Sequence, residues 1–267
     1  MSDTCPSGSL EFHSLSVVGS VRSHNEDAVL AEWWTEGESN PLGLDVLAAV
    51  ADGMGGHDRG EWASAAAIDA LKRSLQGVHA VGGLQEAVTN AVLFANLEIL
   101  NSREARRSFR HPGTTLTVAA IRGAECAIVH VGDSRAYMMR DGILEQLTRD
   151  DTIAEEMIRS GRLSPEEAAN WTLSSQLVKA VGSSENLVPS VLRLSLRPAD
   201  ILILCTDGLT GMLSDELIRA LIIDSPSASA ACEALCDAAD RAGGDDNISV
   251  VLYFHGTWRP TGGPSLD

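Results

Sequence analysis

Short apolar runs recur along the chain at lengths typical of β-strands, and two pairs of longer amphipathic stretches separate them. The first pair spans about residues 60–75 and 84–101, where apolar residues follow a helical period. The second pair begins at Ser214, which suits a helix N-cap, and ends with residues 228–242 before a stop signal at Gly243. The predicted strands lie near residues 12–18, 28–34, 45–51, 114–121, 125–131, 135–140, 143–147, 191–195, 200–205 and 247–254.

This order of elements predicts the fold class. Strands, two helices, strands, two helices and a final strand do not alternate as in a parallel βαβ fold. The order favours antiparallel sheets packed face to face with a helix pair on each outer face, which is an α+β fold built as a four-layer α/β/β/α sandwich. We expect one domain over residues 12–254, with flexible ends at 1–11 and 255–267.

Residues 148–185 are predicted to form an insertion between sheet strands. The insertion holds two short amphipathic stretches at 153–160 and 165–171, divided by Gly161. A long insertion with its own helices is often a functional flap over a site. The alternative is a passive elaboration of the surface.

Composition argues against several classes of function. The formal net charge is −17, and nucleic-acid binding depends on clustered Lys and Arg, so we expect no nucleic-acid partner. No apolar run approaches the ~20 residues that span a bilayer, and the first residues do not read as a secretory signal, so we expect a cytoplasmic protein with no membrane partner. The five cysteines show no metal-ligand spacing, and we interpret them as free thiols.

Acidic residues stand at the ends of five predicted strands. A carboxylate at the end of a buried strand must be neutralised, because burying an isolated charge is very unfavourable. Any one of these acids also fits a solvated strand end, but acids at the ends of all five strands together favour a site for a hard metal ion. The acids are Asp52 after residues 46–51, Asp133 after 126–132, Asp207 after 201–206, Asp246 before 248–254, and Glu26 and Asp27 before 28–30.

Asp141-Gly142 provides an internal comparison. This pair stands between the two short apolar stretches 136–140 and 143–147, which is the pattern of a tight hairpin. We therefore assign Asp141 to a surface turn and give it no chemistry. Asp52 and Asp207 differ, because wholly apolar runs precede them and loop or helix signals follow.

Six motifs stand in a fixed order: Arg22-x-x-Asn25-Glu26-Asp27, Asp52-Gly53-Met54-Gly55-Gly56-His57, Gly113-Thr114-Thr115, Gly132-Asp133-Ser134-Arg135, Asp207-Gly208 and Asp246-Asn247. In this order and spacing they resemble the metal-dependent serine/threonine protein phosphatases of type 2C, the PPM family, in its compact bacterial form. The resemblance covers roughly residues 12–254. It implies a phosphatase catalytic domain with a central β-sandwich flanked by helix pairs.

The resemblance also implies the cofactors, which are two Mn²⁺ or Mg²⁺ ions and a third, weaker ion in bacterial members. Asp52 would bridge the two ions, and the Gly53 carbonyl would bind one of them. Asp207 and Asp246 would hold the other ion, and Asp133 would bind the third together with Asp207. Oxygen ligands alone suit Mg²⁺ and Mn²⁺ better than Zn²⁺.

Three further roles follow from the same resemblance. Glu26 would contact the ions through metal-bound water, Asp27 would orient such waters, and Arg22 would bind the substrate phosphate. A hydroxide that bridges the ions would attack phosphorus directly, without a phospho-enzyme. Arg22, Asp52 and Asp207 are therefore the candidate catalytic residues.

The sequence leaves the proton donor for the leaving serine oxygen open. Some family members have His directly after the first Asp-Gly, where this chain has Met54. His57, His24 and metal-bound water are the alternatives. A second departure is Asp151, which stands where the family often has the His of Asp-His-Ser at the start of the flap, and it concerns substrate handling rather than the metal core.

Phosphoserine and phosphothreonine proteins are the substrates that the resemblance implies, with a bacterial eukaryotic-like Ser/Thr kinase as the opposing partner, and we expect a monomer. One rival function is another two-metal phosphoesterase, such as a nuclease, which the acidic composition disfavours. A second rival is a pseudophosphatase that binds phosphoproteins or regulators. Because all the motif acids are present, the sequence favours the enzyme.

Overall fold

The computed structural model describes residues 10–34, 40–55, 58–77, 82–102, 111–169, 171 and 175–257, and their strands form two antiparallel sheets. The first sheet has the order β1 (Leu10–Val17), β11 (Ile248–Thr257), β10 (Ile201–Cys205), β7 (Arg135–Arg140) and β8 (Ile143–Gln146). The second has the order β2 (Asp27–Trp33), β3 (Val46–Met54), β5 (Leu116–Arg122), β6 (Glu125–Val131) and β9 (Ser190–Ser195), with the short β4 (Gly113–Thr114) paired to β3.

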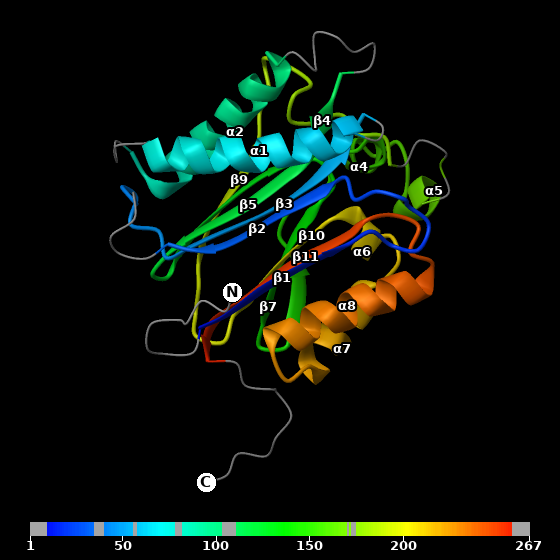
Figure 1. Cartoon of the computed structure of the whole chain (residues 1–267). Coiled ribbons are helices and arrows are strands. Elements are labelled where there is room, and N and C mark those ends of the chain that lie inside the picture. Colours follow the sequence, from blue (N-terminus) through cyan, green and yellow to red (C-terminus); the bar gives the residue numbers. More distant parts are fainter. Residues whose placement is uncertain are drawn as a thin grey trace.

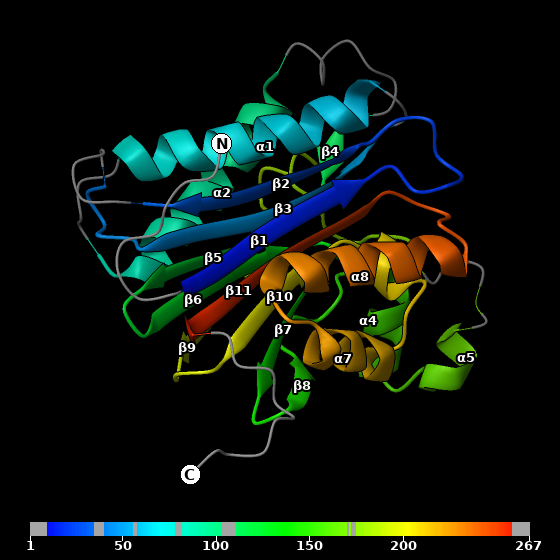
Figure 2. The ribbon, with the colours of Figure 1, turned by 60° about the horizontal axis from the view of Figure 1, so that its bottom comes forward.

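Helices cover the outer face of each sheet (Figures 1 and 2). The pair α1 (Asp58–Gly77) and α2 (Leu84–Leu100) packs on the second sheet, and the pair α7 (Asp215–Asp224) and α8 (Ala228–Ala242) packs on the first. Ser214 caps α7 as predicted, because its Oγ accepts a hydrogen bond from Leu217 N at 3.3 Å. The two sheets with a helix pair on each outer face confirm the predicted four-layer α/β/β/α sandwich. Three shorter helices complete the described elements: α4 (Ile153–Arg159), α5 (Pro165–Ala169) and α6 (Asp207–Thr210).

Strand β3 shows why its sequence is apolar without alternation. Successive side chains of a strand point to opposite faces of the sheet. Val46, Ala48 and Val50 pack between the two sheets, whereas Leu47 and Ala49 pack against the helices, and all five are buried. A central strand covered on both faces is apolar at every position.

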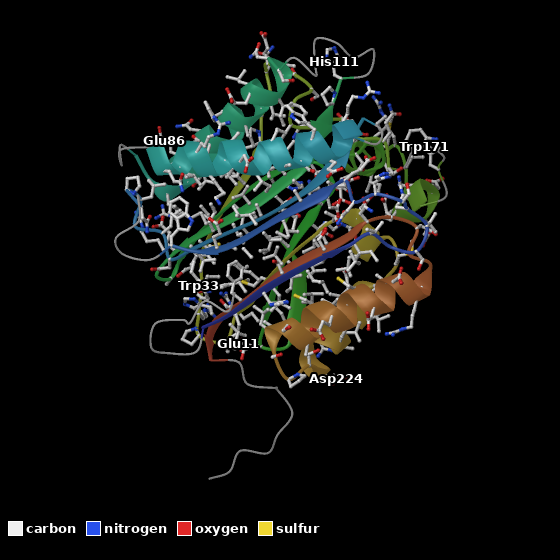
Figure 3. All side chains as sticks on the ribbon, in the orientation of Figure 1. Glu11, Trp33, Glu86, His111, Trp171 and Asp224 are labelled. Carbon is white, nitrogen blue, oxygen red and sulfur yellow. The ribbon has the colours of Figure 1, made fainter. Side chains whose placement is uncertain are left out.

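Aromatic side chains fill the space between the sheets at the end of β2 farthest from Asp27. Trp33 packs edge-on against Phe12 and Tyr253, with ring centroids 5.5 Å and 6.3 Å away. Trp33 and the flap residue Trp171 lie at opposite ends of the sandwich (Figure 3). The apolar packing at the Trp33 end contrasts with the acidic residues at the other end, where β2 begins.

The structure extends several predicted strands. Strand β3 continues to Met54, because Asp52 pairs with Asp27 of β2 and Gly53 pairs with Thr114 of β4. Residues 10–11 and 255–257, which we predicted to lie in flexible ends, belong to the paired strands β1 and β11. Asp207 is the first residue of α6, in line with the helix signals expected after it. Among the described residues, none of the helices has the length and apolar character needed to cross a membrane.

The hairpin predicted at Asp141-Gly142 is confirmed. Arg140 of β7 pairs with Ile143 of β8, which leaves these two residues as the turn. Both have positive φ, 52° at Asp141 and 73° at Gly142, which is the conformation of a type I′ turn. The Arg219 guanidinium donates a hydrogen bond to the Gly142 carbonyl and ties the turn to α7.

We expect Gly142→Ala to lower the free energy of unfolding by about 1 kcal/mol, because alanine is strained at positive φ. Gly77→Ala is the matched control. Gly77 ends α1, its φ lies outside the left-handed region, and an added Cβ would meet nothing within 4 Å. The control should be neutral or stabilising, as for other Gly→Ala changes in helices. Urea unfolding measures both, and an equal loss in the two variants would contradict the turn assignment.

Candidate active site

A cavity of about 660 Å³ opens at the end of the sandwich where β2 and β11 begin and β3 and β10 end. Because neighbouring strands are antiparallel, the end of one strand lies beside the start of the next, and acids distant in sequence meet there. Residues 175–177 of the flap form part of the wall. The cavity is lined by all but one of the predicted site residues, namely Arg22, Glu26, Asp52, Gly53, Asp133, Asp207 and Asp246.

Asp27, the remaining predicted residue, does not line the cavity. Its Oδ2 accepts hydrogen bonds from Thr206 Oγ1 at 2.9 Å and Ser249 Oγ at 2.6 Å. Its main chain pairs with Asp52 across β2 and β3. Burial raises the pKa of Asp27 to about 7, the two hydroxyls oppose the shift, and the charge of Asp207 adds to it. The structure therefore places Asp27 in a hydrogen-bonded layer next to the cavity-lining acids.

The main chain of Asp52 is fixed by the two threonines of the Gly113-Thr114-Thr115 motif. Asp52 N donates to Thr115 Oγ1 at 2.8 Å, and Thr115 N donates to Asp52 O at 2.9 Å. Thr114 Oγ1 also donates to Asp52 O at 2.8 Å. Thr115 Oγ1 lies 2.7 Å from Ser134 Oγ, which links this frame to the loop that carries Asp133. The motif therefore has a structural role, because its hydrogen bonds fix the backbone of Asp52 and link it to the Asp133 loop.

Gly53 must be glycine for steric reasons. A Cβ at this position would lie 2.1 Å from the Gly60 carbonyl oxygen and 2.5 Å from the Glu26 carbonyl oxygen. Gly60 is also constrained, because its Cβ would lie 2.7 Å from the Gly53 carbonyl oxygen. Close approach of β3, the start of α1 and the β1–β2 loop therefore depends on these two glycines.

Asn247 ties the β1–β2 loop to the start of β11. Its Oδ1 accepts from Glu26 N at 2.7 Å, and its Nδ2 donates to Val18 O at 2.8 Å and His24 O at 2.9 Å. Its own N–H donates to Asp246 Oδ1 at 2.8 Å. All the hydrogen-bonding groups of this buried amide are used. The motif Asp246-Asn247 contained this residue, but sequence reasoning assigned it no role.

Burial, followed by repulsion between neighbouring carboxylates, determines the electrostatics of the cavity. Burial, followed by the charges of Asp27 and Asp207, raises the pKa of Asp52 well above its usual range. Burial and the charge of Asp207 raise the pKa of Asp133 to about 7. Burial and the charge of Asp246 raise the pKa of Asp207. These carboxyl groups favour their protonated form unless a positive charge is present.

Arg22 supplies one positive charge at the rim. Its Nη2 lies 2.7 Å from Asp246 Oδ2, and its Nε donates to the Asp245 carbonyl oxygen at 3.2 Å. Half of the Arg22 side chain is exposed, and Arg22 both pairs with Asp246 and lines the cavity.

The donor chemistry of the cavity fits hard divalent cations. Its ionisable lining is rich in carboxylates, and Asp207 Oδ1 is buried without a hydrogen-bond partner in the described part of the chain. As the side chains stand, no three or more His, Cys, Asp or Glu side chains within the described ranges are arranged as a formed metal site. Asp246, for example, is paired with Arg22, so ligation by this carboxylate would exchange the ion pair for the cation.

The candidate proton donors have different positions. His57 lies outside the described residues. His24 lines the cavity from the β1–β2 loop, and its Nδ1 lies 2.8 Å from Ser23 Oγ. Met54 lines the cavity at the position where some family members have His. His24 is therefore the candidate histidine that the described part of the structure places at the cavity.

Comparison with known proteins supports one family. The family model for protein phosphatase 2C matches residues 20–249. The serine/threonine protein phosphatase PstP of Mycobacterium tuberculosis is 36% identical over 257 residues, covering 94% of this chain and 47% of the relative. This chain thus spans about half the length of that protein.

Two further comparisons cover most of both chains. The serine/threonine phosphatase stp of Listeria monocytogenes is 30% identical over 237 residues, covering 88% of this chain and 91% of the relative. A crystal structure of the catalytic domain of PstP, in complex with two manganese ions, matches with a TM-score of 0.77 and 34% identity, covering 92% of this chain and 97% of that one. With the motifs, the sandwich and the family model in agreement, the chain belongs to the protein phosphatase 2C family.

Proposed function

We propose that this chain hydrolyses phosphoserine and phosphothreonine in proteins in a metal-dependent reaction. The observation that carries the proposal is the gathering of Asp52, Asp133, Asp207 and Asp246 around one cavity beside the guanidinium of Arg22. Carboxylates that repel one another in a partly buried site favour cations, and cations beside an arginine favour a phosphate.

When bound, a pair of Mn²⁺ or Mg²⁺ ions supplies Lewis acidity, lowering the pKa of a water that attacks phosphorus and neutralising the charge of the phosphoryl group. Asp52 is the proposed bridging ligand, and the Gly53 carbonyl is proposed to bind one ion. Asp207 and Asp246 are proposed to hold the other. Asp133, beside Asp207, is proposed to bind a third, weaker ion. The support is their carboxylate and carbonyl oxygens at one cavity.

Arg22 is proposed to bind the phosphate, because a guanidinium donates to two phosphate oxygens at once. Its exposure at the cavity rim supports this role. Glu26 is proposed to hold water at the ions from the β1–β2 loop. Asp27, fixed by Thr206 and Ser249, is proposed to orient such waters. Positioning and charge neutralisation supply most of the catalysis in phosphoryl transfer.

The proposed substrates are proteins phosphorylated by a Ser/Thr kinase. The support comes from the relatives, since PstP and stp are named serine/threonine phosphatases. Turnover of phosphothreonine and phosphotyrosine peptides with Mn²⁺, and with a chelator, tests the proposal. We expect Mn²⁺-dependent release of phosphate that prefers phosphothreonine and stops in the chelator.

Asp207→Asn is expected to lower kcat by at least about 100-fold in a folded protein, because it removes a negative charge that binds the ions. Asp141→Asn is the matched control, since Asp141-Gly142 is also an Asp-Gly pair but lies in the β7–β8 turn. The control should retain full activity. Near-wild-type turnover of Asp207→Asn would contradict the role assigned to Asp207. In the wild-type protein, nuclease activity would favour another two-metal phosphoesterase, and Mn²⁺ binding without turnover would favour a pseudophosphatase.

Arg22→Ala is expected to lower kcat/KM for a phosphopeptide by about 10- to 100-fold, which corresponds to the ~1.5–3 kcal/mol of a charged hydrogen bond. Arg22→Lys should recover part of the loss, since Lys binds phosphate as a point charge. Arg241→Ala, which removes an exposed guanidinium on α8, serves as the control. Equal kinetics of the Arg22 and Arg241 variants would remove Arg22 from the proposal.

The metal-free protein should lose stability as the pH rises. Asp27 and Asp133 have pKa values of about 7 in the fold, against about 4 in an unfolded chain. Each binds its proton more tightly when folded, so its stabilisation is complete below about pH 4 and is lost as the pH rises through about 7. Thermal unfolding with a chelator should therefore give a lower Tm at about pH 8 than at about pH 6.

Mn²⁺ should raise Tm more at the higher pH, because the cation replaces the lost protons. Asp133→Asn removes one of the carboxyl groups with a raised pKa and should flatten the pH dependence of the metal-free protein. A chelated protein whose Tm rises between about pH 6 and pH 8 would contradict the electrostatic description of the cavity.

A further inference from the structure

Asp151, where the chain departs from the Asp-His-Ser pattern, makes contacts with two separate segments. Its Oδ1 lies 2.6 Å from Lys179 Nζ, and its Oδ2 accepts a hydrogen bond from Gly132 N at 3.1 Å. Only 10% of its side chain is exposed, against 36% for Lys179. A mostly buried carboxylate with both oxygens engaged differs from the exposed ion pairs that contribute little to stability.

The main chain of Asp151 joins the same two segments. Asp151 N donates to Gly132 O at 2.6 Å, and Asp151 O accepts from Val178 N at 2.8 Å. The pairing continues along the flap, because Ile153 N donates to Gln176 O at 2.9 Å. We call Gly132, Asp151 and Lys179 the flap clasp.

Both segments held by the flap clasp reach the active-site cavity. Asp133 follows Gly132 directly, and Gln176 and Leu177 lie just before the segment that contains Lys179; all three line the cavity. Gly132 has a φ of 112°, and an added Cβ would lie 2.5 Å from the Thr115 side chain, so its loop has little freedom. A shift of Asp151 would therefore move an acidic ligand candidate and the flap wall together.

The neighbouring acid cannot take over this role. Asp150 is held by Arg135, whose Nε donates to Asp150 Oδ1 at 2.9 Å and whose Nη2 donates to Asp150 Oδ2 at 2.8 Å. Besides joining the two segments, Lys179 places a positive charge beside the Asp151 carboxylate. Without its charge, the Asp151 carboxylate would add to the negative charge next to Asp133.

We propose that Asp151, neutralised by Lys179, is a positioning residue that sets the place of Asp133 and of the flap wall, Gln176 and Leu177, at the metal site. It acts through these residues and touches neither metal nor substrate. The inference rests on the proposed function, because metal binding by Asp133 belongs to that proposal.

Three variants separate the contributions of the flap clasp. Asp151→Asn keeps an acceptor for Gly132 N–H and loses the charge. Lys179→Met removes the neutralising charge and leaves the carboxylate in place. The double variant D151K/K179D restores an ion pair with the charges exchanged, but its Lys cannot accept from Gly132 N–H.

Three measurements read the effect. They are Mn²⁺ affinity by calorimetry, KM and kcat for a phosphopeptide at saturating Mn²⁺, and hydrogen exchange at the amides of Val178 and Ile153. We expect D151K/K179D to weaken Mn²⁺ binding by on the order of 10-fold, as for other residues that orient metal ligands, and to raise KM more than it lowers kcat. Asp151→Asn should have a smaller effect of the same kind.

Asp200→Asn is the matched control. Asp200 also forms a buried ion pair, at 2.6 Å to Arg140 Nη2, but it precedes β10 at the end opposite Asp207. This control should lower Tm and leave Mn²⁺ affinity and KM unchanged. If the Asp151 variants behave in the same way, the flap clasp is merely structural and the positioning role is wrong.

Hydrogen exchange separates this inference from the proposed function. If the wild type shows no Mn²⁺-dependent turnover, the proposed function fails, whereas exchange at Val178 and Ile153 still tests whether Asp151 orders the flap. Faster exchange at these amides in the Asp151 variants, and not in Asp200→Asn, supports the flap clasp. Unchanged exchange overturns it.

Discussion

Repulsion between carboxyl groups at one end of the sandwich is the constraint on which the rest of the site depends. Burial raises the pKa of Asp52, Asp133 and Asp207, and the charge of a neighbouring carboxylate raises each of these pKa values further. Protons relieve the repulsion at low pH, and in the proposed function cations would relieve it at neutral pH. The proposed metal binding, the proposed substrate binding and the expected pH dependence of stability would therefore be linked through the same few side chains.

The four-layer sandwich supplies the frame that holds these groups against their repulsion. The helix layer covers one face of β3, and the first sheet covers the other. This burial on both faces fixes the path of β3 to Asp52. The side chains of Thr115 and Asn247 then accept hydrogen bonds from the backbone N–H groups of Asp52 and Glu26, which fixes the backbone on either side of the cavity. These two side chains bond to backbone groups there, and Asp207 Oδ1 has no hydrogen-bond partner in the described part of the chain. Rigid elements with satisfied supporting contacts are what a precise metal site requires.

The sequence predicted the fold class and the acids that line the cavity, because both follow from local patterns of apolar and polar residues. Flanking residues were enough to separate Asp52 from Asp141, although glycine follows both. The path of β3 through Asp52 was not predicted, since it depends on pairing with β2 and β4. The partners of the acids were also missed, because they are distant in sequence: Asn247 is 221 residues from Glu26 and Thr206 is 179 residues from Asp27. Such contacts exist only after the sheets have assembled.

Anomalous diffraction at the manganese edge, from crystals grown with Mn²⁺, tests the central claim most directly. Our account predicts two strong peaks about 3.5–4 Å apart, with Asp52 between them and with Asp207 and Asp246 at one of them. Each peak should lie about 2 Å from its oxygen ligands, as for small hard cations. Peaks away from these carboxylates, or no peak in crystals saturated with Mn²⁺, would contradict the claim that the acids form a two-metal centre.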